Sequence, residues 1–98
     1  MEFKHSPAPW NYNGNYCGAV EGSTEDMVAC AYPMHYENAE EMKANAHLIA
    51  AAPELLEVLI DIVEMQSKNY GNGTTTYIKL KKLAEKANLA ITKALGQQ

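Results

Sequence analysis

The feature of this chain that most constrains its fold is NAHLIAAAPELLEVLIDIVEM, residues Asn45–Met65, which is apolar over most of its length. A proline interrupts it at position 53. Proline suits the first turn of a helix, because its missing N–H leaves no helical hydrogen bond unmade there. We therefore expect a first helix over residues 39–51 and a second over residues 53–67, joined at this Ala-Pro junction. Asn38 is the expected N-cap of the first helix.

The second helix is expected to be apolar on most of its sides. Its polar residues recur every three or four positions and form one narrow stripe: Glu54, Glu57, Asp61, Glu64 and Lys68. A surface helix ordinarily has an apolar stripe little wider than 100°. Leaving four or five large side chains in water would forfeit roughly 8–12 kcal/mol, against a total stability of about 5–15 kcal/mol for a small domain. We therefore expect a homo-oligomer that covers this surface; the alternative is a monomeric core that buries it.

A third helix is expected over residues 75–95. Its apolar seam should face the second helix, and consists of Tyr77, Leu80, Leu83, Ala84, Ala87, Ile91 and Ala94. Lysines follow another face, at positions 79, 82, 86 and 93. We expect these lysines to complement the acidic stripe of the second helix. In an oligomer, the alternative is that Lys79 and Lys82 line a pocket for a small anionic ligand.

The N-terminal third is expected to form a small sheet. Residues 1–9 contain two prolines and predict an extended lead-in. In residues 10–32, Asn13-Gly14 is a strong hairpin signal and Glu21–Asp26 is a polar turn before the apolar run Met27–Tyr32. The predicted fold is α+β: an N-terminal three-stranded antiparallel meander followed by three helices in residues 38–96, all in one domain spanning residues 1–98.

Composition excludes several classes of protein. The net charge is −4 and all eight basic residues are lysine, which argues against a duplex DNA binder. The three histidines lack the spacing of zinc ligands and no CxxC occurs, so we expect no metal and no cofactor. No catalytic motif is present, so the protein is not expected to be an enzyme. The chain has no apolar run long enough for a membrane span and no signal peptide, which predicts a cytosolic location.

A cluster of aromatic and asparagine residues is the best candidate for a ligand site. It comprises Trp10, Asn11, Tyr12, Asn13 and Tyr16. Aromatic rings can stack on a base, and asparagine offers both a donor and an acceptor to its polar edge. The alternative is that the aromatics stabilise strands and the asparagines make turns. Asn45 and His47 lie among alanines in the first helix, where they would serve either close packing or a ligand crevice.

Two motifs resemble a known group. HSPAPW at His5–Trp10 and ANAHLIAAAPELLEVL at Ala44–Leu59 resemble the H-[ST]-P-x-P-W and N-A-x-L-I-A-A-A-P-E-L-L patterns of short phage and prophage accessory proteins, mostly of unassigned function. The group usually has threonine at the position of Ser6, glycine at that of Ala8 and arginine at that of His47, so this sequence departs from the usual residues at these three positions. If that arginine holds an anion, His47 does so only when protonated.

The resemblance implies a phage accessory protein acting in the cytosol of a bacterial host. By analogy of class, it implies an inhibitor of host defence. The predicted function is a non-enzymatic oligomeric binder that sequesters a nucleotide-type host immune signal. The alternative is a protein-interaction module that blocks a host protein through its apolar helical face.

Overall fold

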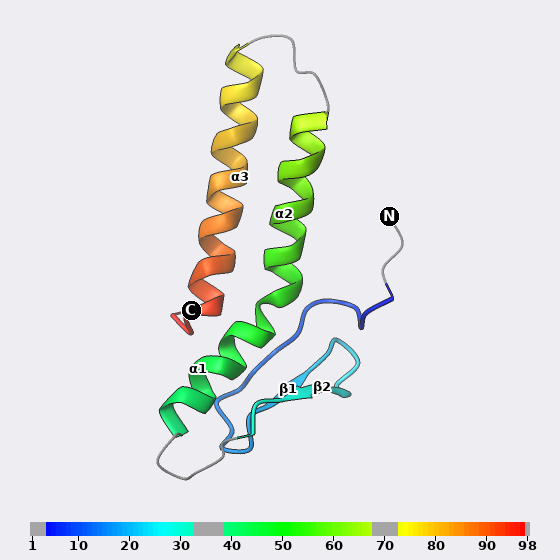
Figure 1. Ribbon diagram of the computed structural model, residues 1–98, viewed down its shortest axis with the longest axis vertical. Helices are drawn as coiled ribbons and strands as arrows, with labels where there is room; N and C mark the ends of the chain where they lie inside the picture. The colour runs from blue at the N-terminus through cyan, green and yellow to red at the C-terminus, as the bar shows by residue number, and fades with distance from the viewer. Residues whose placement is uncertain (1–3, 33–38, 68–72, 98) are drawn as a thin grey trace.

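The computed structural model describes residues 4–32, 39–67 and 73–97. Within these ranges the elements are β1 (Ala19–Glu21), β2 (Met27–Cys30), α1 (Ala39–Ala50), α2 (Ala52–Ser67) and α3 (Gly73–Ala94). The β-hairpin lies beside α1, while α2 and α3 extend away from it as an antiparallel pair (Figure 1). The molecule measures 54 × 26 × 18 Å, with a radius of gyration of 16.3 Å. A compact chain of this length has a radius of gyration of about 13 Å, so the helical pair protrudes.

The expected α+β class with three helices is confirmed, but the three-stranded meander is wrong, since the described residues form a two-stranded sheet. The expected first strand is reduced to one bridge, in which Asn11 and Glu21 exchange backbone hydrogen bonds of 2.7 and 2.9 Å. The asparagine side chains explain the loss. The Asn13 carbonyl oxygen accepts from the Asn15 backbone N–H, and that of Asn15 accepts from the Ala19 N–H. Such local bonds compete with a strand ladder and turn the chain into a loop.

The two strands pair antiparallel, with Ala19 opposite Cys30 and Val20 opposite Ala29. An irregularity follows Val20, so that the next pair is Glu21 with Met27. Gly18 precedes β1 with a φ of +70°, and its carbonyl accepts a 2.9 Å hydrogen bond from the Ala31 N–H. The backbones approach so closely here that a Cβ on Gly18 would lie 2.3 Å from the Ala31 oxygen. Glycine is therefore required at this crossing.

The helices begin and end near the positions that the sequence predicts. α1 ends at Ala50 and α2 begins at Ala52, with Pro53 in its first turn. The bend is continuous in hydrogen bonds, because the Ala51 N–H donates to the His47 carbonyl and the Leu55 N–H donates to the Ala51 carbonyl. The predicted N-cap Asn38 lies outside the described residues.

The core is small and lies between the β-hairpin and α1. Val20, Ala46 and Ala50 are its centre, and partly buried side chains such as Ile49 and Val28 pack around them. Among the described residues, Val20 is the largest side chain that is fully buried. Among the described residues, the protruding helices contribute only Pro53, Val58 and Ala90 to the buried set. Most of the apolar surface that the sequence places on α2 is therefore not covered within one chain.

The contact between α2 and α3 differs from the expected seam. The acidic stripe of α2 faces α3, where Lys86 bridges Glu57 and Asp61 at 2.8 and 2.7 Å and Lys93 pairs with Glu54. The predicted complementarity between lysines and acids is therefore observed for Lys86 and Lys93, and it forms the contact itself. Because charged pairs occupy the contact, much of the α3 seam is turned toward solvent.

Candidate functional site

A crevice lies where α1, the end of α3 and the segment before β1 meet. It has a volume of about 150 Å³ and is lined by Asn11, Tyr12, His47, Ala50, Lys93 and Gly96. We call it the Tyr12 crevice. A second hollow of about 330 Å³ adjoins it, because Asn11 and Lys93 line both. The larger hollow falls at the lower end of the range of ligand pockets, about 300–1,000 Å³.

Tyr12 and His47 form the aromatic wall of the crevice. Their rings meet edge to face, with centroids 4.9 Å apart and an interplanar angle of 83°. The Tyr12 hydroxyl donates a 2.5 Å hydrogen bond to the Asn15 carbonyl, which fixes the ring at the loop. Burial raises the pKa of Tyr12 above its ordinary value, and the nearby Lys43 ammonium opposes this in part. The phenol is therefore protonated at neutral pH and acts as a neutral wall rather than a base.

Gly96 lets α1 and α3 approach each other at the crevice. It ends α3 with a φ of +70°, and the Gly96 and Gln97 N–H groups donate back to the Lys93 and Thr92 carbonyls. This is the usual arrangement at a glycine helix stop. A Cβ on Gly96 would lie 2.7 Å from Cδ2 of His47. One glycine thus terminates the helix and makes room for the imidazole.

The charges around the crevice are already paired. The Lys93 ammonium donates to one oxygen of Glu54, whose other oxygen is buried and has no hydrogen-bond partner. Hydrogen bonds to Asp61 and Glu57 raise the pKa of Lys86, which lines the adjoining hollow. A strongly anionic ligand would have to compete with these carboxylates. The arrangement suits a small ligand with a flat apolar part and polar edges, which the exposed Asn11 amide can read.

One comparison decides the origin of the chain. The model of a family described as Salmonella phage P22 protein Y8K6 matches residues 1–98. The chain belongs to this phage protein family. No curated protein and no solved structure matches it. The expectation of a phage protein is therefore confirmed at the level of the family, whose description assigns no activity or ligand.

The aromatic residues predicted to stack on a ligand do not share one site in this phage protein. Trp10 packs edge-on against His5, with centroids 6.2 Å apart, and its indole N–H donates to the Ser6 carbonyl. Tyr16 is 76% exposed, and the Lys43 ammonium lies 4.3 Å from its ring centroid. Only Tyr12 lines the crevice. Asn13 serves the loop through its bond to Asn15, which is the alternative role that the sequence left open.

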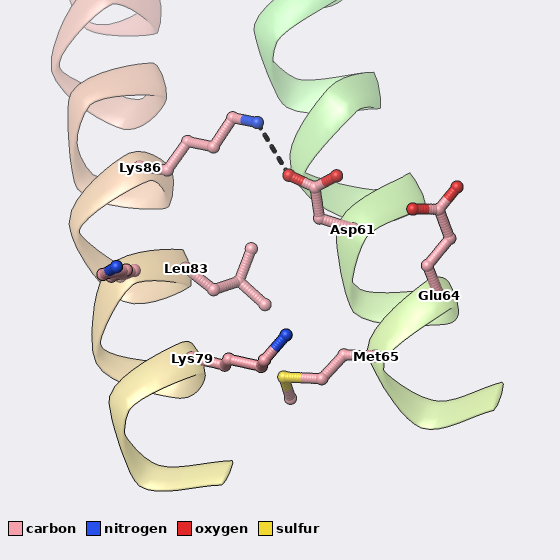
Figure 2. A pocket seen from close by; sticks show the side chains of 7 residues that line it. Asp61, Glu64, Met65, Lys79, Leu83 and Lys86 are labelled. Carbon is pink, nitrogen blue, oxygen red and sulfur yellow. Dashed lines mark hydrogen bonds and ion pairs between the residues drawn. The ribbon is translucent and has the colours of Figure 1, made fainter. Parts of the chain in front are cut away.

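Asn45, Lys79 and Lys82, which were also predicted to bind a ligand, lie outside the Tyr12 crevice. Asn45 is exposed on α1 and does not line the crevice. Lys79 and Lys82 line another hollow between α2 and α3, with Asp61, Glu64, Met65, Leu83 and Lys86 (Figure 2). Lys82 is eleven positions before Lys93, or about 16 Å along the helix. Within one chain these lysines therefore cannot join the crevice, and the acids beside them make the hollow a mixed site.

The sequence predicted Asn11, Tyr12 and His47 as site residues, but it did not predict Lys93 and Gly96, which also line the Tyr12 crevice. The available signals were the lysine face of the third helix and the helix-stop glycine.

Within the described ranges, no group of three potential metal ligands occurs. Cys17 and Cys30 are free thiols, and Cys30 donates to the Cys17 carbonyl. No described helix has the length and hydrophobicity needed to cross a bilayer.

Proposed function

We propose that this phage protein is a non-enzymatic, oligomeric binder that sequesters a small nucleotide-type host immune signal in the Tyr12 crevice. The observation that carries the proposal is the convergence of Asn11, Tyr12, His47 and Lys93 on one crevice from three separate segments. Tyr12 and His47 supply flat aromatic walls, and Asn11 supplies a donor and an acceptor. Membership of a phage family is consistent with a role against the host.

The paired charges narrow the chemistry of the ligand. The Lys93 ammonium is already paired with the Glu54 carboxylate, so a phosphate gains little unless it displaces that carboxylate. The site therefore favours contacts to the base or sugar over contacts to phosphate. Anionic nucleotides should bind through the base, with the phosphates toward solvent.

Calorimetry tests this proposal. The protein is titrated with a panel of cyclic nucleotides and ADP-ribose derivatives, and a binding heat with at least one is expected. Asn11→Ala should weaken binding about two- to tenfold, because one polar contact contributes about 0.5–1.5 kcal/mol. Asn45→Ala is the matched control, since this exposed asparagine lies outside the crevice and should leave affinity unchanged. An absence of heat with every compound would overturn the proposal.

A second candidate is a module that blocks a host protein through the apolar helical face. It is favoured by large apolar side chains exposed on α2 and α3, such as Leu59 and Leu80. A tagged protein should then retain one host protein in stoichiometric amount, and Leu59→Lys should release it. Release of a small molecule without any protein band would instead support sequestration.

A further inference from the structure

Figure 1 shows α2 and α3 side by side, projecting beyond the rest of the chain. We propose that a second copy of this chain covers one side of this pair and that the two pairs form a four-helix bundle. The inference rests on the oligomeric part of the proposed function and not on its ligand. This side, which we call the α2–α3 face, is formed by Leu59, Ile62, Leu80, Ala84, Ala87 and Ile91.

Helix geometry places these residues on one side. The ion pair between Asp61 and Lys86 marks where each helix faces the other. Ile62 lies one residue after Asp61 and Ala87 one residue after Lys86, which is a rotation of about 100° in each helix. Because the helices are antiparallel, equal rotations away from their contact lead to the same side of the pair. Leu59 and Leu80 fall within about 60° of these positions.

The α2–α3 face is apolar and exposed to solvent. Leu59 is 59% exposed, Ile62 44%, Leu80 51% and Ile91 49%. Helical spacing places no Asp, Glu or Lys on this face between Ala52 and Met65 or between Tyr77 and Ala94. The charged pairs of Lys86 and Lys93 lie along the contact and the opposite side. A monomer gains no solubility from such a surface, and exposed apolar patches of this kind mark interaction sites.

Three observations favour a second copy as the occupant. Leu80, Ala84, Ala87 and Ile91 follow a 4-3-4 spacing, which is the repeat that packs helices into left-handed bundles. The two alanines lie between larger residues, so an identical face can interdigitate with it across a two-fold axis. The absence of charge also matters, because two chains of net charge −4 can meet here without placing like charges opposite each other.

The size of the face is also suitable. α2 has 16 residues and is therefore about 24 Å long. Two helices side by side are about 20 Å wide, which gives a flat footprint on the order of 500 Å² before the relief of the side chains is counted. Stable complexes bury about 800 Å² of accessible surface per partner, so a pair of these faces approaches that class. Dimerisation would give the protruding helices the core that one chain lacks.

Sedimentation equilibrium of the whole chain at micromolar concentration tests the inference. The expected mass is twice the 10.8 kDa of one chain. Leu59→Lys and Leu80→Lys should each raise the dimer dissociation constant about 30-fold or more, as for a residue at the centre of an interface. Both residues are exposed in the single chain, so circular dichroism should show the helices retained.

Ile78→Lys is the matched control. Ile78 is 49% exposed and Leu80 is 51% exposed, so the two side chains are similarly accessible. Ile78 lies two residues before Leu80 and therefore about 200° around the helix from it. This variant should remain a dimer. A monomeric parent protein, an assembly that both face substitutions leave intact, or equal dissociation by Ile78→Lys would each overturn the inference. Calorimetry with Asn11→Ala measures ligand binding in the Tyr12 crevice independently of the oligomeric state. Failure of the dimer and failure of ligand binding are therefore distinguished.

Discussion

Substitution of Gly18 by alanine should strongly destabilise the β-hairpin. Gly18 has a φ of +70°, and a residue with a Cβ in this conformation costs about 1–2 kcal/mol. The new Cβ would also lie 2.3 Å from the Ala31 carbonyl oxygen. Relief requires the backbones to separate by about 1 Å, which breaks the 2.9 Å hydrogen bond between the Ala31 N–H and the Gly18 carbonyl. The total loss is expected to be about 3–4 kcal/mol.

Gly14→Ala provides the matched control. Gly14 also has a positive φ, of 89°, but a Cβ there meets no atom within 4 Å. Only the conformational cost of about 1–2 kcal/mol should appear. Urea denaturation followed by circular dichroism measures both free energies of unfolding. Equal losses in the two variants would show that the close approach of the backbones at Gly18 is wrong.

Two further predictions concern titrating groups. Hydrogen bonds to Asp61 and Glu57 raise the pKa of Lys86, so its contribution to stability is fully present below the pKa of the unfolded lysine and is lost as the pH rises through the higher folded value. Since the Lys86 side chain is 41% exposed, Lys86→Met should cost only about 0.5 kcal/mol at neutral pH in urea melts, and a loss above 2 kcal/mol would contradict this. Tyr12→Phe removes the hydrogen bond to the Asn15 carbonyl and should cost about 1 kcal/mol by the same assay. In a spectrophotometric pH titration, this variant should lack one phenol that ionises at a higher pH than an exposed tyrosine. A titration curve identical to that of the parent protein would refute the effect of burial on the pKa of Tyr12.

The helices could be predicted because their signals are local. The three-to-four-residue spacing of polar positions, Pro53 at the junction and Gly96 at the stop all act through neighbours along the chain. The prediction of a third strand was wrong for a related reason. Asn13-Gly14 favours a turn, but Asn13 and Asn15 also bind nearby backbone groups, and sequence cannot rank these local bonds against a ladder that forms only at Asn11.

The candidate site was predicted only in part. Asn11, Tyr12 and His47 were selected by residue type, and the fold brings them together. Trp10 and Tyr16 were selected in the same way, yet they lie in other surroundings. Side chains from different elements meet only when the elements pack, and no spacing along the chain encodes how the end of α3 meets α1.

The sequence by itself determined the three helices, the narrow acidic stripe and the excess of apolar surface around Leu59, because these follow from residue type and helical period. Only the tertiary structure decided how the faces are oriented. It placed Glu54, Glu57 and Asp61 against the lysines of α3, and so turned Leu80 and Ile91 toward solvent. The physical reason is that a helical period defines faces but not partners. The partner of each face is chosen by the balance of packing and charge among elements that are distant in sequence.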